Sequence, residues 1–136
     1  MNLETILNRL PHRIIVNCER EPYLHRWYLI RTARIGVFIH KFIRSDEDRA
    51  LHDHPWNFLA LPIWRGYFEH SQFGRRRIWP LLGMRFRKAE YRHRVELIQN
   101  RPAWSLFIRF RERRTWGFWL ASGFQAWNDW WREKCE

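Results

Sequence analysis

Two histidines separated by a single residue are the strongest sign of chemistry in this sequence. His52 and His54 stand at the entry to an apolar segment that we expect to be a β-strand. In an extended chain, residues i and i+2 point to the same face, so the two imidazoles would lie side by side. A third histidine, His93, begins another expected strand. Three neutral imidazoles that leave open coordination positions suit a divalent ion such as Zn, Fe, Ni or Mn, so the sequence predicts a metal site.

The same pattern leaves open a fourth ligand and an interpretation without metal. His40 and Glu69 are the candidates for an additional ligand. In the interpretation without metal, the two neighbouring histidines are hydrogen-bonded to the backbone or to Asp46 and Asp48 of the preceding loop. In the metal-binding interpretation, an acidic residue of that loop, or Asp53, accepts a hydrogen bond that fixes a histidine tautomer.

The elements that must position these residues are mostly strands. Residues 34–42 and 104–110 alternate with a period of two, and shorter runs of the same kind lie between them, separated by turn signals. At the two ends of the chain, residues 3–10 and 125–134 carry apolar side chains at helical spacing. The sequence therefore predicts an antiparallel sandwich or barrel with a short helix at each end.

The histidine pattern resembles the first motif of the cupin superfamily, small β-barrels whose His-x-His pair is followed by a carboxylate and then by a glycine. Here Gly66 has the spacing of that glycine, whereas the carboxylate position falls on Leu59. The second motif of the superfamily supplies a lone histidine, which His93 matches, although the positions around it depart from the pattern. The resemblance covers about residues 34–110, and residues 38–69 look like small cupin-like proteins of phages and bacteria.

This resemblance implies an all-β, cupin-like double-stranded β-helix barrel (jelly roll) with short N- and C-terminal helices, formed by residues 1–136 as a single cupin-like domain. It also implies a metal in the barrel mouth, held by His52, His54 and His93, and metal-dependent chemistry on a small molecule. Without the carboxylate ligand the site would keep the full charge of the ion and favour an anionic ligand. No nucleophile–base pair is visible, so the sequence does not decide whether the protein is an enzyme. A non-enzymatic accessory or interaction protein is the alternative.

The chain is strongly basic, which introduces a rival function. It has 25 Lys and Arg against 14 Asp and Glu, a net charge of +11 over 136 residues. Arg75, Arg76 and Arg77 form a basic cluster beside a turn. Further arginines at period-two positions make basic strand faces, interleaved with aromatic residues, that would suit a nucleic-acid backbone with stacked bases. The arginines are Arg85, Arg87, Arg109, Arg111 and Arg113, and the aromatic residues are Trp79, Phe86 and Phe107. Against this, the arginines are spread along the chain, and their stems can cover tryptophan faces in a purely structural role.

Hydropathy and cysteine content predict the surroundings of the protein. No apolar run approaches the roughly 20 residues of a membrane helix, and no signal peptide is indicated, so we expect a cytoplasmic protein. We expect Cys18 and Cys135 to be reduced, with a bond between them as the alternative. The tryptophan-rich C-terminal segment predicts core packing or a dimer interface, so a homodimer is a further expectation.

Overall fold

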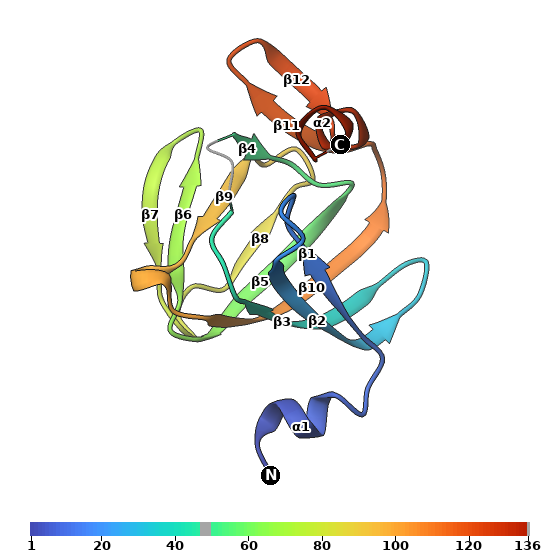
Figure 1. Cartoon of the computed structure of the whole chain (residues 1–136), viewed down its shortest axis with the longest axis vertical. Helices are drawn as coiled ribbons and strands as arrows, with labels where there is room; N and C mark the ends of the chain where they lie inside the picture. Colours follow the sequence, from blue (N-terminus) through green and yellow to red (C-terminus); the bar gives the residue numbers. More distant parts are fainter. Residues whose placement is uncertain (47–49, 136) are drawn as a thin grey trace.

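The computed structural model describes residues 1–46 and 50–135, which fold into two antiparallel β-sheets (Figure 1). The first sheet contains, in spatial order, β1 (His12–Val16), β2 (Pro22–Arg31), β3 (Gly36–Phe42), β10 (Ala103–Glu112), β5 (Trp56–Trp64) and β8 (Arg85–Arg87). The second contains β12 (Gly123–Ala126), β11 (Gly117–Leu120), β4 (Leu51–His52), β9 (His93–Glu96), β6 (Tyr67–Ser71) and β7 (Gly74–Ile78). The predicted all-β jelly roll is confirmed.

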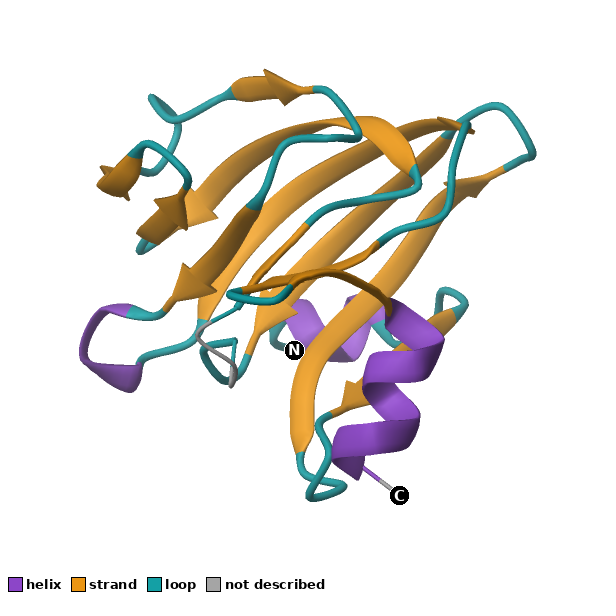
Figure 2. Cartoon of the chain, turned by 90° about the horizontal axis from the view of Figure 1, so that it is seen from above, coloured by secondary structure: helices purple, strands orange, loops and turns teal. Residues whose placement is uncertain are grey.

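The two terminal helices lie at opposite ends of the molecule in Figure 1, and Figure 2 shows the same helices in purple. Helix α1 (Leu3–Leu7) begins at Asn2, whose side chain accepts a hydrogen bond from the backbone of Thr5. Helix α2 (Trp127–Cys135) follows the β11–β12 hairpin, and a short 3-10 turn, η1 (Ile98–Asn100), follows β9. The terminal helices expected from the sequence are therefore present. Among the described residues, no helix combines the length and apolar character needed to cross a bilayer.

The predicted alternation of β3 and β10 sorts their side chains into an inner and an outer face. On β3, Phe38 and His40 are buried on the inner face, and on β10 Ser105 and Phe107 are buried beside them. These residues, except Phe38, line a cavity between the two sheets. Because a one-residue slip would turn every inner side chain outward, the register of these strands determines which residues reach the interior.

A tight turn at Gly66 joins β5 to β6 and connects the two sheets. Arg65 and Gly66 both have positive φ, 68° and 65°. A Cβ atom on Gly66 would lie 2.1 Å from the carbonyl oxygen of Ile78, so this position excludes a side chain. The turn starts β6 in the phase that buries Tyr67 and Glu69.

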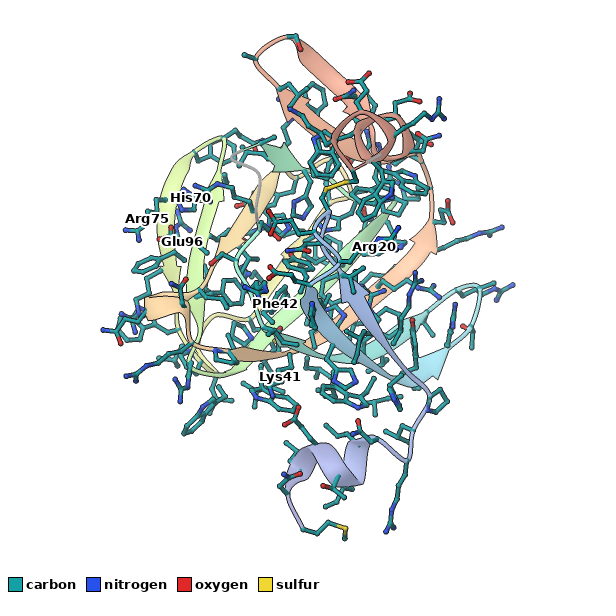
Figure 3. All side chains as sticks on the ribbon, in the orientation of Figure 1. Arg20, Lys41, Phe42, His70, Arg75 and Glu96 are labelled. Carbon is teal, nitrogen blue, oxygen red and sulfur yellow. A yellow bond between two sulfur atoms is a disulfide. The ribbon has the colours of Figure 1, made fainter. Side chains whose placement is uncertain are left out.

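A disulfide joins Cys18, just after β1, to Cys135 at the end of α2, so the expectation of two reduced thiols is wrong (Figure 3). The two cysteines are separated by 117 positions in the sequence. Their proximity arises from the packing of α2 against the barrel, and no local pattern encodes that packing.

The fully buried carboxylate of Asp53 fixes the short strand β4 to β11. It accepts hydrogen bonds of 2.9 Å from the backbone N–H of Gly117 and from the indole N–H of Trp119. It also forms an ion pair of 3.0 Å with Arg114. Asp53 thus holds the end of β4 against β11. Its carboxylate does not fix a histidine tautomer.

We expect Asp53→Ala to destabilise the protein by about 3 kcal/mol, because it leaves a cation and two N–H donors without their buried acceptor. Urea unfolding monitored by tryptophan fluorescence measures the change. The matched control is Asp129→Ala, which removes an exposed carboxylate paired with Arg132 on α2 and should cost less than about 1 kcal/mol. Equal effects of the two substitutions would contradict the role assigned to Asp53.

Candidate metal centre

The structure brings the three predicted ligands together. His52 on β4 is paired directly with His93 on β9, and His54 follows two residues after His52. The ring centroids are 4.9–5.1 Å apart, with 5.1 Å between His52 and His54 and 4.9 Å between His52 and His93. One ligand nitrogen from each ring lies within 4.8 Å of the other two. This is the convergence that a three-nitrogen metal site requires.

Burial keeps these imidazoles in the form that binds metal. Desolvation lowers the pKa of His52 to about 4, although the nearby carboxylate of Asp46 opposes the shift. Desolvation also lowers the pKa of His54 well below its ordinary value. Positive charge on His93, His52, Arg26 and Arg114 would lower it further. Both rings are therefore neutral at pH 7, with lone pairs available for a cation.

Glu69 holds the third histidine in a defined orientation. Its Oε2 lies 2.9 Å from Nδ1 of His93, and the carboxylate is almost fully buried. An ionised carboxylate accepts a hydrogen bond, so Nδ1 of His93 is the protonated nitrogen and Nε2 is left for a metal. The carboxylate itself is not part of the ligand cluster in the described structure. Glu69 therefore orients the His93 ring through its Nδ1 and is not itself a ligand candidate.

Two arginines and a tyrosine compensate the charge of Glu69. Arg85 and Arg87 lie 3.1 Å and 3.5 Å from its carboxylate oxygens, and the hydroxyl of Tyr91 donates a hydrogen bond of 2.9 Å. Burial alone would raise the pKa of Glu69, but the hydrogen bond from His93 and the charges around the carboxylate outweigh it and hold the pKa well below its ordinary value. Glu69 is therefore ionised at neutral pH.

The remaining sequence-based candidates that the structure describes lie outside the ligand cluster. His40 is buried on β3, outside the cluster, where its Nε2 accepts a hydrogen bond of 2.9 Å from Nε of Arg26. The carboxylate of Asp46 accepts a hydrogen bond from the backbone of Val95 and lies 3.9 Å from Nδ1 of His52. Asp48 lies outside the described residues. Arg26 was not singled out by the sequence analysis, although its spacing from Leu24 on β2 places both residues on one strand face.

The surroundings of the cluster fit a bound cation. Nδ1 of His54 is buried and has no hydrogen-bond partner in the described structure. An unpaired buried polar atom costs about 1–3 kcal/mol, and a metal ion coordinated there would supply a partner. The cluster opens into a cavity of about 530 Å³, large enough for a small molecule. On β5, Phe58 packs against the ring of His54, so the next residue, Leu59, points away from the site and supplies no ligand.

The arginine cluster on β7 is largely engaged in local contacts. Arg75 forms an ion pair of 3.1 Å with Glu96, and its guanidinium lies 3.6 Å from the ring centroid of Phe68. Figure 3 labels Arg75, Glu96 and His70 together at this edge of the molecule. The guanidinium of Arg77 lies over Trp79, and all three arginine side chains of the cluster are exposed. These contacts match the structural role considered for the arginines, and no finding favours nucleic-acid binding.

Solved structures that include cupin-superfamily proteins have a similar fold. The structure of HppE with Fe(II) and an alternative substrate matches with a TM-score of 0.60 at 13% identity, covering 76% of this chain and 57% of that one. DMSP lyase DddQ from Ruegeria pomeroyi matches with a TM-score of 0.61 at 12% identity, covering 79% and 59%. A sugar phosphate isomerase of the cupin superfamily from Silicibacter pomeroyi matches with a TM-score of 0.60 at 14% identity, covering 88% of each chain.

The chain thus has a cupin-like fold, as its histidine motif predicted. It spans less than two thirds of the length of the HppE and DddQ chains. No family model matches the sequence, and no curated protein is similar enough to match it. At these identities the comparisons establish the fold, and the activity has to be argued from the site.

We expect Glu69→Gln to lower the stability by about 3 kcal/mol, because the substitution keeps the size of the side chain but leaves the buried Arg85 without its counter-charge. Chemical unfolding measures the change. The matched control is Glu96→Gln on the outer face of β9, where Arg75 and the carboxylate are partly exposed and the loss should stay below about 1 kcal/mol. A larger loss in the control than in Glu69→Gln would contradict this assignment.

Proposed function

We propose that the protein binds one divalent metal ion through His52, His54 and His93 and uses it to bind or transform a small anionic molecule. The observation that carries this proposal is the convergence of three imidazoles on the wall of a cavity. The iron in the HppE structure, which has the same fold, is consistent with such a site. A three-histidine set suits Zn, Fe, Ni or Mn, and the proposal does not depend on which of these is bound.

The residues around the cluster are suited to support a metal. When bound, the ion would supply Lewis acidity or activate oxygen or water. Glu69 keeps Nδ1 of His93 protonated, so that its other nitrogen faces the cluster. Trp56 stacks on His54, and Phe118 lies against His52, so aromatic side chains restrict both rings and limit the access of water.

The charge balance of the site favours an anionic ligand. The three imidazoles contribute no negative charge, and the charge of Glu69 is already matched by Arg85 and Arg87. The charge of a divalent ion would therefore remain largely uncompensated until a ligand arrives.

A cytoplasmic location and a homodimer stay predictions. The disulfide between Cys18 and Cys135 is more typical of oxidising compartments.

We expect protein purified without a histidine tag to contain about one divalent ion per chain, measured by plasma mass spectrometry. The double variant His52→Ala/His54→Ala should contain almost none, because a single remaining imidazole cannot hold the ion. The matched control, His12→Ala/His70→Ala, removes two histidines outside the cluster and should keep the metal.

The same samples test the link between metal and folding. A chelator should lower the melting temperature of the parent protein, since a ligand present at about 100 times its dissociation constant stabilises the native state by about 2.7 kcal/mol. The chelator should have no such effect on the His52→Ala/His54→Ala variant. Absence of metal from the parent, together with an unchanged melting temperature under chelator and after addition of Zn²⁺, would contradict the proposed function.

A further inference from the structure

The cavity that contains the histidine cluster also contains a cation that has no acidic partner among the described residues. Arg26 on β2 lines the cavity together with His52, His54 and His93. Its Nε donates a hydrogen bond of 2.9 Å to His40. Among the described residues, no carboxylate lies within ion-pair distance of its guanidinium. Arginine remains charged even where burial lowers its pKa, as it does here.

The other charged groups of the cavity wall, Arg85 and Asp46, are engaged by partners other than Arg26. Arg85 is paired with Glu69 at 3.1 Å, and it also donates a hydrogen bond to the hydroxyl of Tyr67. The carboxylate of Asp46 accepts hydrogen bonds from the hydroxyl of Tyr23 and the backbone of Val95. A largely buried charge without a partner is costly, so the uncompensated guanidinium is the point at which an anion would gain most.

His40 holds this guanidinium in place. The imidazole is buried and stacks on Phe107 with ring centroids 4.9 Å apart, so its position is fixed by packing. Burial lowers its pKa, which keeps the ring neutral and Nε2 able to accept the bond from Arg26. That bond uses one of the five N–H donors of the guanidinium, and Tyr28 lies beside the group. Donors therefore remain for a planar, bidentate ligand.

The rest of the cavity is suited to an apolar body with few polar atoms. Its volume is about 530 Å³, and most of its wall is aromatic or aliphatic. Trp130 of α2 lines it as well, and the buried indole N–H of this residue has no hydrogen-bond partner in the described structure. A ligand oxygen would satisfy that donor.

We propose that Arg26, with His40 as its positioning residue, binds the carboxylate of a small, largely apolar organic acid in this cavity. In the metal-free protein one cation without an acidic partner among the described residues matches one negative charge, which favours a carboxylate over a phosphate dianion. The inference rests on the proposed function in one respect, since the same cavity places the ligand next to the metal-binding histidines.

The test compares 4-phenylbutyrate with its neutral amide, 4-phenylbutyramide, by calorimetry on metal-free and on Zn²⁺-loaded protein. We expect the acid to bind about tenfold or more tightly than the amide in both forms, because a charge-assisted hydrogen bond contributes more than a neutral one. In Arg26→Gln the two probes should bind alike. The matched control, Arg111→Gln, removes an equal charge from the exposed part of β10 and should keep the preference.

The His40→Phe variant and a competition with inorganic phosphate complete the test. His40→Phe should reduce the preference for the acid without abolishing binding of the amide, because it removes the acceptor and keeps a ring. On the metal-free protein, inorganic phosphate should not displace 4-phenylbutyrate. Equal binding of acid and amide by the parent, a preference that survives in Arg26→Gln, or displacement by phosphate would each overturn the inference. The zinc content of the same samples distinguishes this failure from failure of the metal proposal.

Discussion

The buried carboxylate of Glu69 contacts residues of both sheets, and the need to compensate its charge constrains how the two sheets pack. A lone charge in this position would be costly to desolvate, so the fold has to surround it with compensating groups. Those groups come from both sheets. Arg85 and Arg87 stand on β8 of the first sheet, whereas Tyr91 and His93 approach from β9 and the segment before it in the second. The charge therefore couples the packing of the two sheets to the orientation of one histidine.

The position of Glu69 and its pairing with two arginines also determine which charges the cavity presents to a ligand. The superfamily motif provides a carboxylate next to the histidines, and this chain has Leu59 at that position. Glu69 supplies a carboxylate from another strand, but its charge is matched by two arginines and does not reach the cluster. The neutral histidines and Arg26 consequently line the same cavity, and among the described residues no carboxylate, that of Asp46 included, forms an ion pair with Arg26. Both features favour an anion in the cavity, for independent reasons.

The sequence predicts the local parts of this structure well. A period of two fixes which side chains of β3 and β10 share a face, and it places His52 beside His54. What it cannot supply is the pairing between distant strands, because hydrogen-bonded neighbours such as β4 and β9 share no local signal. For that reason the role of Glu69 as an anchor for His93, the hydrogen bond between Arg26 and His40 and the bond between Cys18 and Cys135 became visible only in three dimensions.

The disulfide gives the molecule an unusual mechanical property. It turns residues 18–135 into a covalently closed loop that contains every strand except β1. A force that pulls residue 1 away from α2 would be carried by the sulfur–sulfur bond before it reached the enclosed strands. Only the 17 residues before Cys18 could extend, by at most about 60 Å. Under tension the three clustered histidines, all of which lie inside the loop, would therefore bear no load.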